Sequence, residues 1–288
     1  MNSIPEALQD LKRRINAGKA VVITQLILVI ASAVVTLGFH QWTPGIILMA
    51  VMMAMYFVVS RPMSSSYNKA VAKANIRFGI CPELDDYSYD FKGNMDKAAF
   101  DEWKMLPSSD KKGGLFLRHG FSGTSKNITF TGNEATIANL VPQEGKRPAR
   151  FFLSGTLLTA QGELAQDKGD WLFLREELLP EELLAPFIRD NGYIKAECPV
   201  AGFECWSQAP GNAFPADLAE KLSEFYTRNE CLAAVRFCAK GAACLLHRRF
   251  YTGSGKASQR ITEQQLRYNT LPETEGIWPI FKSWIRKQ

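Results

Sequence analysis

Two long apolar segments near the N-terminus constrain the fold more than any other feature. Residues 20–39 (AVVITQLILVIASAVVTLGF) and 46–60 (IILMAVMMAMYFVVS) contain no Asp, Glu, Lys or Arg. A helix of about 20 residues rises roughly 30 Å, the thickness of the hydrocarbon core of a bilayer. Core helices of soluble proteins normally keep a polar stripe, which both segments lack. The sequence therefore predicts a transmembrane hairpin, with its turn at GFHQWTPG (38–45) and Trp42 at the membrane interface.

A secretory signal peptide is the main alternative, but its apolar region is shorter and is not followed at once by a second one. Basic side chains indicate the orientation of the hairpin. Eight of them flank the two segments and none lies in the turn: Lys12, Arg13, Arg14, Lys19, Arg61, Lys69, Lys73 and Arg77. The positive-inside rule then places both ends of the chain in the cytoplasm, with the hairpin as a multi-pass membrane anchor.

The flanks of the hairpin are predicted to be helical. Residues 1–19 form an amphipathic cytosolic N-terminus whose helix starts at a capping box, Ser3 to Glu6, and lies at the inner membrane surface. The transmembrane hairpin follows at 20–60, and residues 61–79 form a stalk helix that Gly79 ends. The apolar stripe of the stalk, with Tyr67 and Val71, packs either on the cytosolic body or on a partner.

The remaining chain predicts a two-lobed cytosolic α+β domain, so the fold class is α+β. A β-rich lobe covers residues 80–178, beginning with a turn-rich stretch, and a mixed α/β lobe with an aromatic, basic C-terminal segment covers 179–288. Thr131 to Glu134 read as a hairpin turn between two strands. The other expected elements are strands at 115–118, 127–130, 135–140, 149–158, 171–175, 193–198, 203–207, 231–239 and 243–251, and helices at 180–190 and 216–228.

Several segments carry a resemblance to a known family: IRFGICPELDDYSYDF, KMLPSSDKKGGLFLRHGFSGTSKNITFTG, FFLSGTLLTA and FPADLAEKLSEFYTRNECLAAVRFCAKGAACLLHRRF. Together with the hairpin they resemble the bacterial membrane-anchored family catalogued as domain of unknown function 3137. The resemblance covers most of residues 64 to 252 and rests on glycines, apolar strands and one helix. It implies a membrane-anchored α+β protein, and it implies no active-site residues.

Few residues qualify for chemistry. The candidates are His119, His247 and Cys244, which could form a Cys-His or, with Ser122, a Ser-His nucleophile, but no catalytic motif surrounds them. The six cysteines lack the close pairs of a zinc site, and we expect them to be free, small, buried side chains: Cys81, Cys198, Cys205, Cys231, Cys238 and Cys244. The sequence predicts no catalytic residue, cofactor or metal, although an enzyme stays an open alternative.

The C-terminal segment, residues 277–287, combines aromatic and basic side chains at helical spacing. It either lies on the anionic inner leaflet or docks on the cytosolic body through its tryptophans. In the first case the membrane-interface residues, besides Trp42, are Trp278, Phe281, Lys282, Trp284 and Arg286.

Charge limits the classes of partner. The whole chain carries +5 and residues 1–60 carry +2, which leaves +3 for the body, too balanced for a strong nucleic-acid surface. The sequence thus favours a non-catalytic scaffold or adaptor that holds partner proteins at the membrane lipid bilayer. The alternative is a membrane-tethered enzyme or small-ligand sensor with a pocket between the two lobes.

Overall fold

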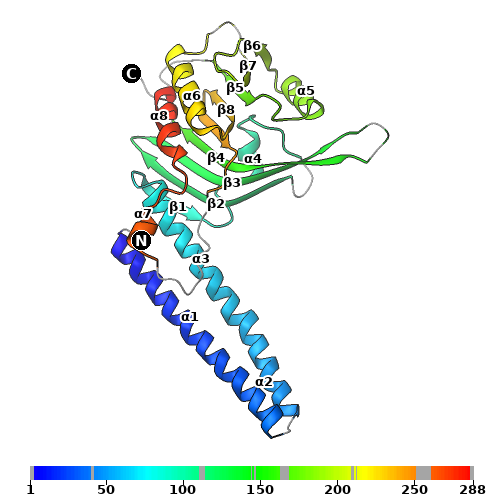
Figure 1. Ribbon diagram of the computed structural model, residues 1–288. Helices are drawn as coiled ribbons and strands as arrows, with labels where there is room; N and C mark the ends of the chain where they lie inside the picture. Colours follow the sequence, from blue (N-terminus) through cyan, green and yellow to red (C-terminus); the bar gives the residue numbers. More distant parts are fainter. Residues whose placement is uncertain are drawn as a thin grey trace. The chain divides into compact units, whose positions relative to one another are not determined.

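The computed structural model describes residues 3–39, 42–109, 114–143, 145, 147–162, 169–208, 211, 213–250 and 261–285. The chain forms two compact units. A helical unit contains Met1–Pro82 together with Tyr251–Thr270, and a sheet unit contains Glu83–Phe250 together with Leu271–Gln288. Figure 1 labels the elements of each unit.

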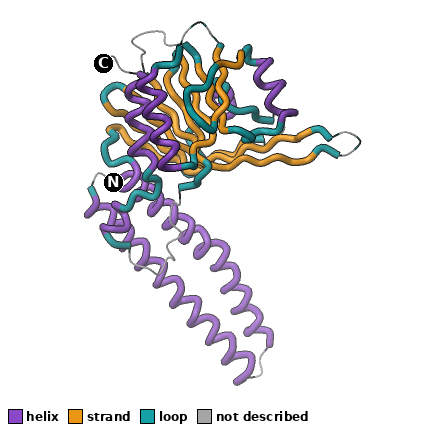
Figure 2. Tube along the Cα trace, turned by 45° about the horizontal axis from the view of Figure 1, so that its top comes forward, coloured by secondary structure: helices purple, strands orange, loops and turns teal. Residues whose placement is uncertain are grey.

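Two long helices dominate the helical unit. Helix α1 (Ile4–Ala33) continues through a wider turn at Val34–Gly38. Helix α2 (Trp42–Met55) continues through Tyr56–Ser60 into α3 (Arg61–Asn75) and ends at Ile76–Ile80. The two helices run side by side, as Figures 1 and 2 show. Ser3 caps α1 by accepting a hydrogen bond from the Glu6 amide at 3.4 Å, which confirms the predicted helix start.

The apolar stripes of the two flanks pack on each other. Ile4, Ala7, Leu11 and Ile15 of α1 are buried in one cluster with a stripe of α3 and one residue of the short helix α7 (Glu263–Arg267), namely Tyr67, Ala70, Val71, Ala74 and Leu266. The predicted membrane-surface position of the N-terminal stripe was therefore wrong, and the stalk stripe, expected on the cytosolic body or on a partner, packs on α1 and α7. Two amphipathic faces on neighbouring helices remove each other's apolar surface from water.

Asn75 joins α3 to the chain segment that contains α7. Its buried side-chain amide donates to the carbonyl oxygens of Gln265 and Tyr268 at 3.3 and 3.0 Å, and its side-chain oxygen accepts from the Thr270 hydroxyl at 3.2 Å. These bonds satisfy backbone groups that would otherwise lose their partners on burial. Residues 261–270 thus fold with the helices, although they follow Asn75 by about 190 residues in the sequence.

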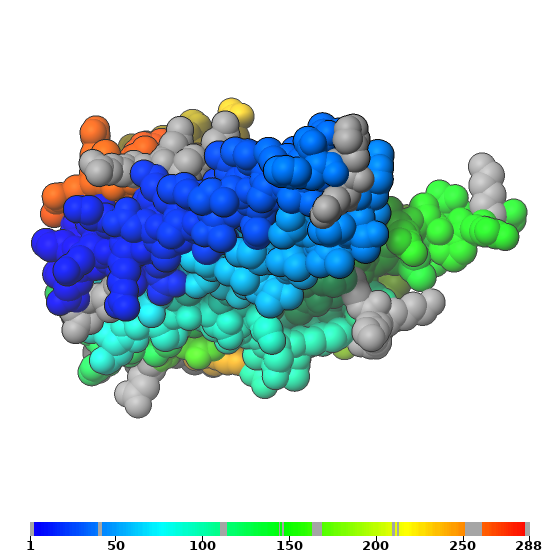
Figure 3. All heavy atoms as spheres, turned by 90° about the horizontal axis from the view of Figure 1, so that it is seen from below, coloured from blue at the N-terminus to red at the C-terminus, as the bar shows by residue number. Residues whose placement is uncertain are grey.

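Farther along the same helices the side chains are apolar and exposed. By length and composition, two helices could cross a membrane, Ile4–Gly38 and Trp42–Ile80. In the most apolar 18 residues of each helix, 6% is buried. Figure 3 shows this part of the chain in blue. The N-terminal region is thus a pair of apolar helices, which weakly suggests a membrane anchor.

The sheet unit contains one antiparallel sheet of nine strands in the order β1-β2-β3-β4-β9-β8-β5-β7-β6. The strands are β1 (Asp85–Asp90), β2 (Leu115–Ser125), β3 (Ile128–Val141), β4 (Ala149–Gln161), β5 (Trp171–Arg175), β6 (Ile194–Ala196), β7 (Phe203–Ser207), β8 (Leu232–Cys238) and β9 (Gly241–Leu246). Helices α4 (Lys97–Asp101), α5 (Glu181–Asp190), α6 (Ala216–Asn229) and α8 (Glu273–Ile285) complete the unit. The α+β class is confirmed.

The predicted boundary between two lobes at residue 178 does not divide the strands into two sheets. The β8–β9 hairpin, from the predicted second lobe, lies between β4 and β5 of the predicted first lobe and pairs with both. Every residue of β8 and β9 is buried, which is typical of strands in the middle of a sheet. The two lobes are one sheet.

The β2–β3 hairpin turns earlier than predicted. Its turn is Lys126-Asn127, both with positive φ (51° and 66°), and β3 runs straight through Thr131 to Glu134. Two positive φ values match the twist of a two-residue hairpin, and Asn tolerates this conformation well. Gly132 lies within the strand because the Phe121 ring occupies the space that a Cβ would need. The stretch at Asp85–Asp90, expected to be turns, forms edge strand β1.

An ion pair is buried where β8 meets β5. The guanidinium group of Arg236 is 4% exposed and donates two hydrogen bonds to the Asp170 carboxylate, at 3.1 and 2.5 Å. A third bond goes to the Trp103 carbonyl oxygen, and the cation lies 5.7 Å from the centre of the Tyr193 ring. The pair therefore ties the middle of the sheet to the α4 region.

We expect Arg236→Met to lower the free energy of unfolding of the sheet unit by about 3 kcal/mol, because it leaves the Asp170 carboxylate without its partner. Chemical denaturation of the full chain in detergent, followed by tryptophan fluorescence, measures the loss. The control is Arg189→Met, which removes an exposed pair with Asp190 and should cost less than about 1 kcal/mol. Equal losses would contradict a special role for the buried pair.

Candidate functional site

The most distinctive surface of the sheet unit is one face of β2, β3 and β4. Directly paired residues point to the same side of a sheet, so the register of the strands defines this face. Between β2 and β3, Phe116 pairs with Thr136 and Arg118 with Glu134. Between β3 and β4, the pairs are Thr136 with Ser154, Ala138 with Phe152, and Leu140 with Arg150. We call these nine residues the outer face. The opposite side carries core residues such as Ile137 and Leu153.

Large apolar side chains lie exposed on the outer face. Phe116, Phe152 and Leu140 are 54%, 57% and 37% exposed. Farther along β3 the same side of the sheet is covered by α8, where Trp278 packs on Phe130 with 4.7 Å between ring centres. The outer face is thus the uncovered part of an otherwise packed surface, and it continues toward the end of the β3–β4 ribbon seen in Figure 2.

Arginines accompany these apolar side chains. Arg118 and Arg150 belong to the outer face, and Arg249 reaches it by donating to the Thr136 hydroxyl at 3.0 Å. The face has a single acidic member, Glu134. Burial raises the pKa of Glu134 to about 7, although the nearby charges of Arg249 and Arg118 lower it. The carboxyl group is therefore about half protonated at neutral pH, and the face is net positive.

His119, a residue singled out from the sequence, lies beside this face in a β-bulge. The β2–β3 register shifts between Arg118 and Phe121, and His119 has a φ of 52°. Its amide donates to the Phe91 carbonyl oxygen at 3.0 Å, and a 2.8 Å hydrogen bond joins its Nδ1 to the Tyr89 hydroxyl. Burial and the Arg118 charge lower the pKa of His119, so its ring is neutral at neutral pH. These contacts hold the bulge.

The other two chemical candidates have different surroundings. Cys244 is fully buried in β9, and burial raises the pKa of its thiol well above the ordinary value, which makes it a poor nucleophile. His247 is exposed just after β9. Within the described part of the chain, no group of three or more His, Cys, Asp or Glu side chains is arranged to hold a metal ion.

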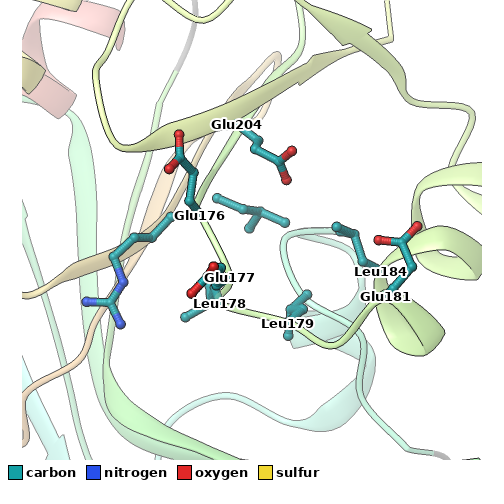
Figure 4. Close-up of a pocket in the computed structure, with 9 residues that line it drawn as sticks. Glu176, Glu177, Leu178, Leu179, Glu181, Leu184 and Glu204 are labelled. Atoms are coloured by element: carbon teal, nitrogen blue, oxygen red, sulfur yellow. The ribbon is translucent and has the colours of Figure 1, made fainter.

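A small acidic pocket lies in the sheet unit at the start of α5 (Figure 4). It has a volume of about 370 Å³ and is lined by Leu174, Arg175, Glu176, Glu177, Leu178, Leu179, Glu181, Leu184 and Glu204. Glu204 pairs with Lys195 at 2.9 Å. Its lining residues come from both sides of residue 178, the predicted boundary between the lobes, although both halves belong to one sheet. Its carboxylates disfavour anionic ligands.

The C-terminal segment docks on the sheet unit. Phe281 and Trp284 are fully buried, and the Trp284 indole N–H donates to the Cys238 carbonyl oxygen at 3.1 Å. Lys282 lies over the Phe130 ring, 5.5 Å from its centre. Phe281 and Trp284 are therefore not membrane-interface residues, because the protein core covers them, while Trp278 is partly exposed and packs on Phe130. Arg286 lies outside the described residues, and Trp42 is exposed at the start of α2.

Sequence reasoning missed Glu134 and the differences among the cysteines, since both depend on pairing between strands that are far apart in the chain. No protein-family model, curated protein or solved structure matches the sequence. The site is therefore interpreted from its own geometry, as an apolar, cationic face of the sheet.

We expect the stability of the protein to fall as the pH rises from about 4.5 to 7, in part because of Glu134. Its pKa in the folded state, about 7, exceeds the value of an exposed glutamate, so the folded state binds the proton more tightly and loses this advantage on deprotonation. Glu134→Gln should remove this part of the dependence and stabilise the protein at pH 8 by about 1 kcal/mol, a figure reduced for partial exposure.

Denaturation midpoints of the variant and the parent between pH 4.5 and 8.5 measure this effect. Glu220→Gln, at an exposed position of α6, is the control, and its profile should run parallel to that of the parent. Parallel profiles for Glu134→Gln and the parent would show that Glu134 titrates like an exposed carboxylate.

Proposed function

We propose that this chain is a membrane-anchored docking protein: two helices hold it in a bacterial inner membrane, with both ends in the cytoplasm, and its sheet unit binds a partner protein. The observation that carries the proposal is the pair of helices whose apolar side chains are exposed along the charge-free segments. Such a surface is costly in water and favourable in lipid. The eight flanking basic residues support the cytoplasmic orientation, and the family resemblance agrees with it.

The outer face is the proposed docking surface. Exposed aromatic side chains flanked by arginines are enriched where proteins bind each other. Arg118 and Arg249 lie near Glu134, whose ionisation burial disfavours, and Arg150 adds a third cation farther along the same face, so the face favours an acidic partner. We therefore propose a protein segment that carries both apolar and acidic side chains. The docking role is non-catalytic, in keeping with the neutral, hydrogen-bonded His119 and the buried Cys244.

The anchor and its orientation are tested by cysteine labelling of full-length variants. Thr43→Cys lies in the proposed turn and Ser64→Cys lies after the second apolar segment, and both side chains are exposed. A thiol reagent that cannot cross the inner membrane should label Thr43→Cys in intact cells, and should label Ser64→Cys only after the cells are broken. Equal labelling of the two variants in intact cells would contradict a membrane-spanning hairpin.

Docking is tested by purifying the full-length protein from native membranes in mild detergent and comparing variants. The double variant Phe116→Ser/Phe152→Ser removes two aromatic side chains that are each about half exposed on the outer face. Recovery of a true partner should therefore fall at least about tenfold. Ile194→Ser is the matched control, because Ile194 is similarly exposed (56%) on edge strand β6. Recovery should also fall with Arg118→Glu and with increasing salt. A partner retained equally by all these variants would rule out the outer face.

A further inference from the structure

The six cysteines of the chain are not equivalent. Cys81, Cys205, Cys238 and Cys244 are buried, while Cys198 and Cys231 are partly exposed. Burial raises the pKa of the thiols of Cys81, Cys238 and Cys244, and it raises that of Cys231 to about 11. These thiols stay protonated and unreactive at neutral pH. Cys198 is the exception.

Cys198 lies next to a second cysteine because of the β6–β7 register. Ala196, in β6, pairs with Cys205, in β7, and Cys198 follows Ala196 by two residues in the connecting loop, before the turn at Gly202 (φ 80°). In an extended chain, residues two apart point to the same side, which brings Cys198 toward Cys205. A side-chain hydrogen bond joins the two thiols. One partner is partly exposed and the other is fully buried.

The hydrogen bond from Cys205 lowers the pKa of Cys198 to about 7, against the opposing effects of burial and of Glu176 and Glu204. The same bond raises the pKa of Cys205, which keeps its proton. In its thiol form Cys198 donates to the Val200 carbonyl oxygen at 3.2 Å. The pair thus combines an accessible, partly ionised thiol with a protonated neighbour, an arrangement typical of redox-sensitive cysteines.

We propose that Cys198 and Cys205 form a redox modification site, in which a peroxide oxidises Cys198 and Cys205 then closes a disulfide between them. The Cys198 thiolate attacks one peroxide oxygen, the O–O bond breaks, and the products are a sulfenic acid and, after proton uptake, water. The Cys205 sulfur then attacks the sulfenic sulfur, a second water leaves, and the S–S bond forms. Two thiols and one hydrogen peroxide become one disulfide and two waters. The inference does not depend on the proposed docking function.

The disulfide would tie the loop after edge strand β6 to β7. Glu204, which lines the acidic pocket of Figure 4, is the neighbour of Cys205 in β7, and Glu176 of the same pocket acts on Cys198 through its charge. Oxidation therefore removes a thiolate beside these carboxylates and fixes one wall of the pocket.

The experiment uses the full-length protein in detergent, reduced and then treated with one equivalent of hydrogen peroxide. Intact mass spectrometry should show a loss of about 2 Da, the two thiol hydrogens, and peptide mapping after alkylation should locate one disulfide between residues 198 and 205. In the Cys205→Ser variant, dimedone should trap a sulfenic acid at Cys198. Cys198→Ser should form no internal disulfide under the same treatment.

Cys231→Ser is the matched control, because Cys231 is also partly exposed but has a raised pKa; this variant should form the disulfide as the parent does. Peptide mapping of the parent protein does not require any variant to fold correctly, so this result is independent of the substitutions. The proposal is overturned if both cysteines of the parent remain alkylatable after peroxide. It is equally overturned if Cys198 is oxidised to a sulfinic acid while Cys205 keeps its thiol.

Discussion

The sheet unit depends on the β8–β9 hairpin. Without it, the strands before residue 162 and those from β5 to β7 would form two separate sheets with open edges, because β9 pairs with the side of β4 opposite β3, and β8 pairs with the side of β5 opposite β7. Its residues are fully buried, so the hairpin contributes apolar area to both halves. The single charged side chain in its two strands, Arg236, needs the Asp170 carboxylate and the Trp103 carbonyl oxygen as partners, so burial of β8 depends on where these two groups lie.

In the helical unit, the burial of side chains changes along the length of the helices. Where α1 and α3 carry a polar face and an apolar stripe, the stripes are buried against each other and against α7, as for Leu11 and Tyr67. Where the helices are apolar all round, the two of them cannot bury their own surface, and side chains such as Leu37 and Val58 stay exposed. One pair of helices therefore changes from protein-like packing to a surface that suits lipid, and the change coincides with the start of the charge-free segments.

Local patterns in the sequence predicted several of the individual elements. The strands at 171–175 and 203–207 were predicted at both ends, and α6 to within one residue. The pairing of strands was not predictable, because nothing in β9 itself indicates that its partner is β4, about 85 residues earlier in the chain. The turn at Lys126-Asn127 was missed in favour of Gly132, since a glycine signals both turns and close approach of a side chain. His119 was a candidate for chemistry from the sequence alone. The pKa values of Glu134 and Cys198 are shifted by neighbours on other strands, which the sequence does not reveal.

The two exposed apolar surfaces of this protein differ in chemistry and therefore in the environment they suit. The helical surface carries no Lys or Arg between residues 20 and 60, and hydrocarbon suits such a surface better than water does. On the sheet, Phe116 and Phe152 lie among arginines that hydrocarbon would exclude. A protein surface with carboxylates can satisfy both the rings and the guanidinium groups, because arginine pairs with carboxylates through directed hydrogen bonds while rings pack on apolar side chains. The contrast argues for lipid at one surface and an acidic protein partner at the other.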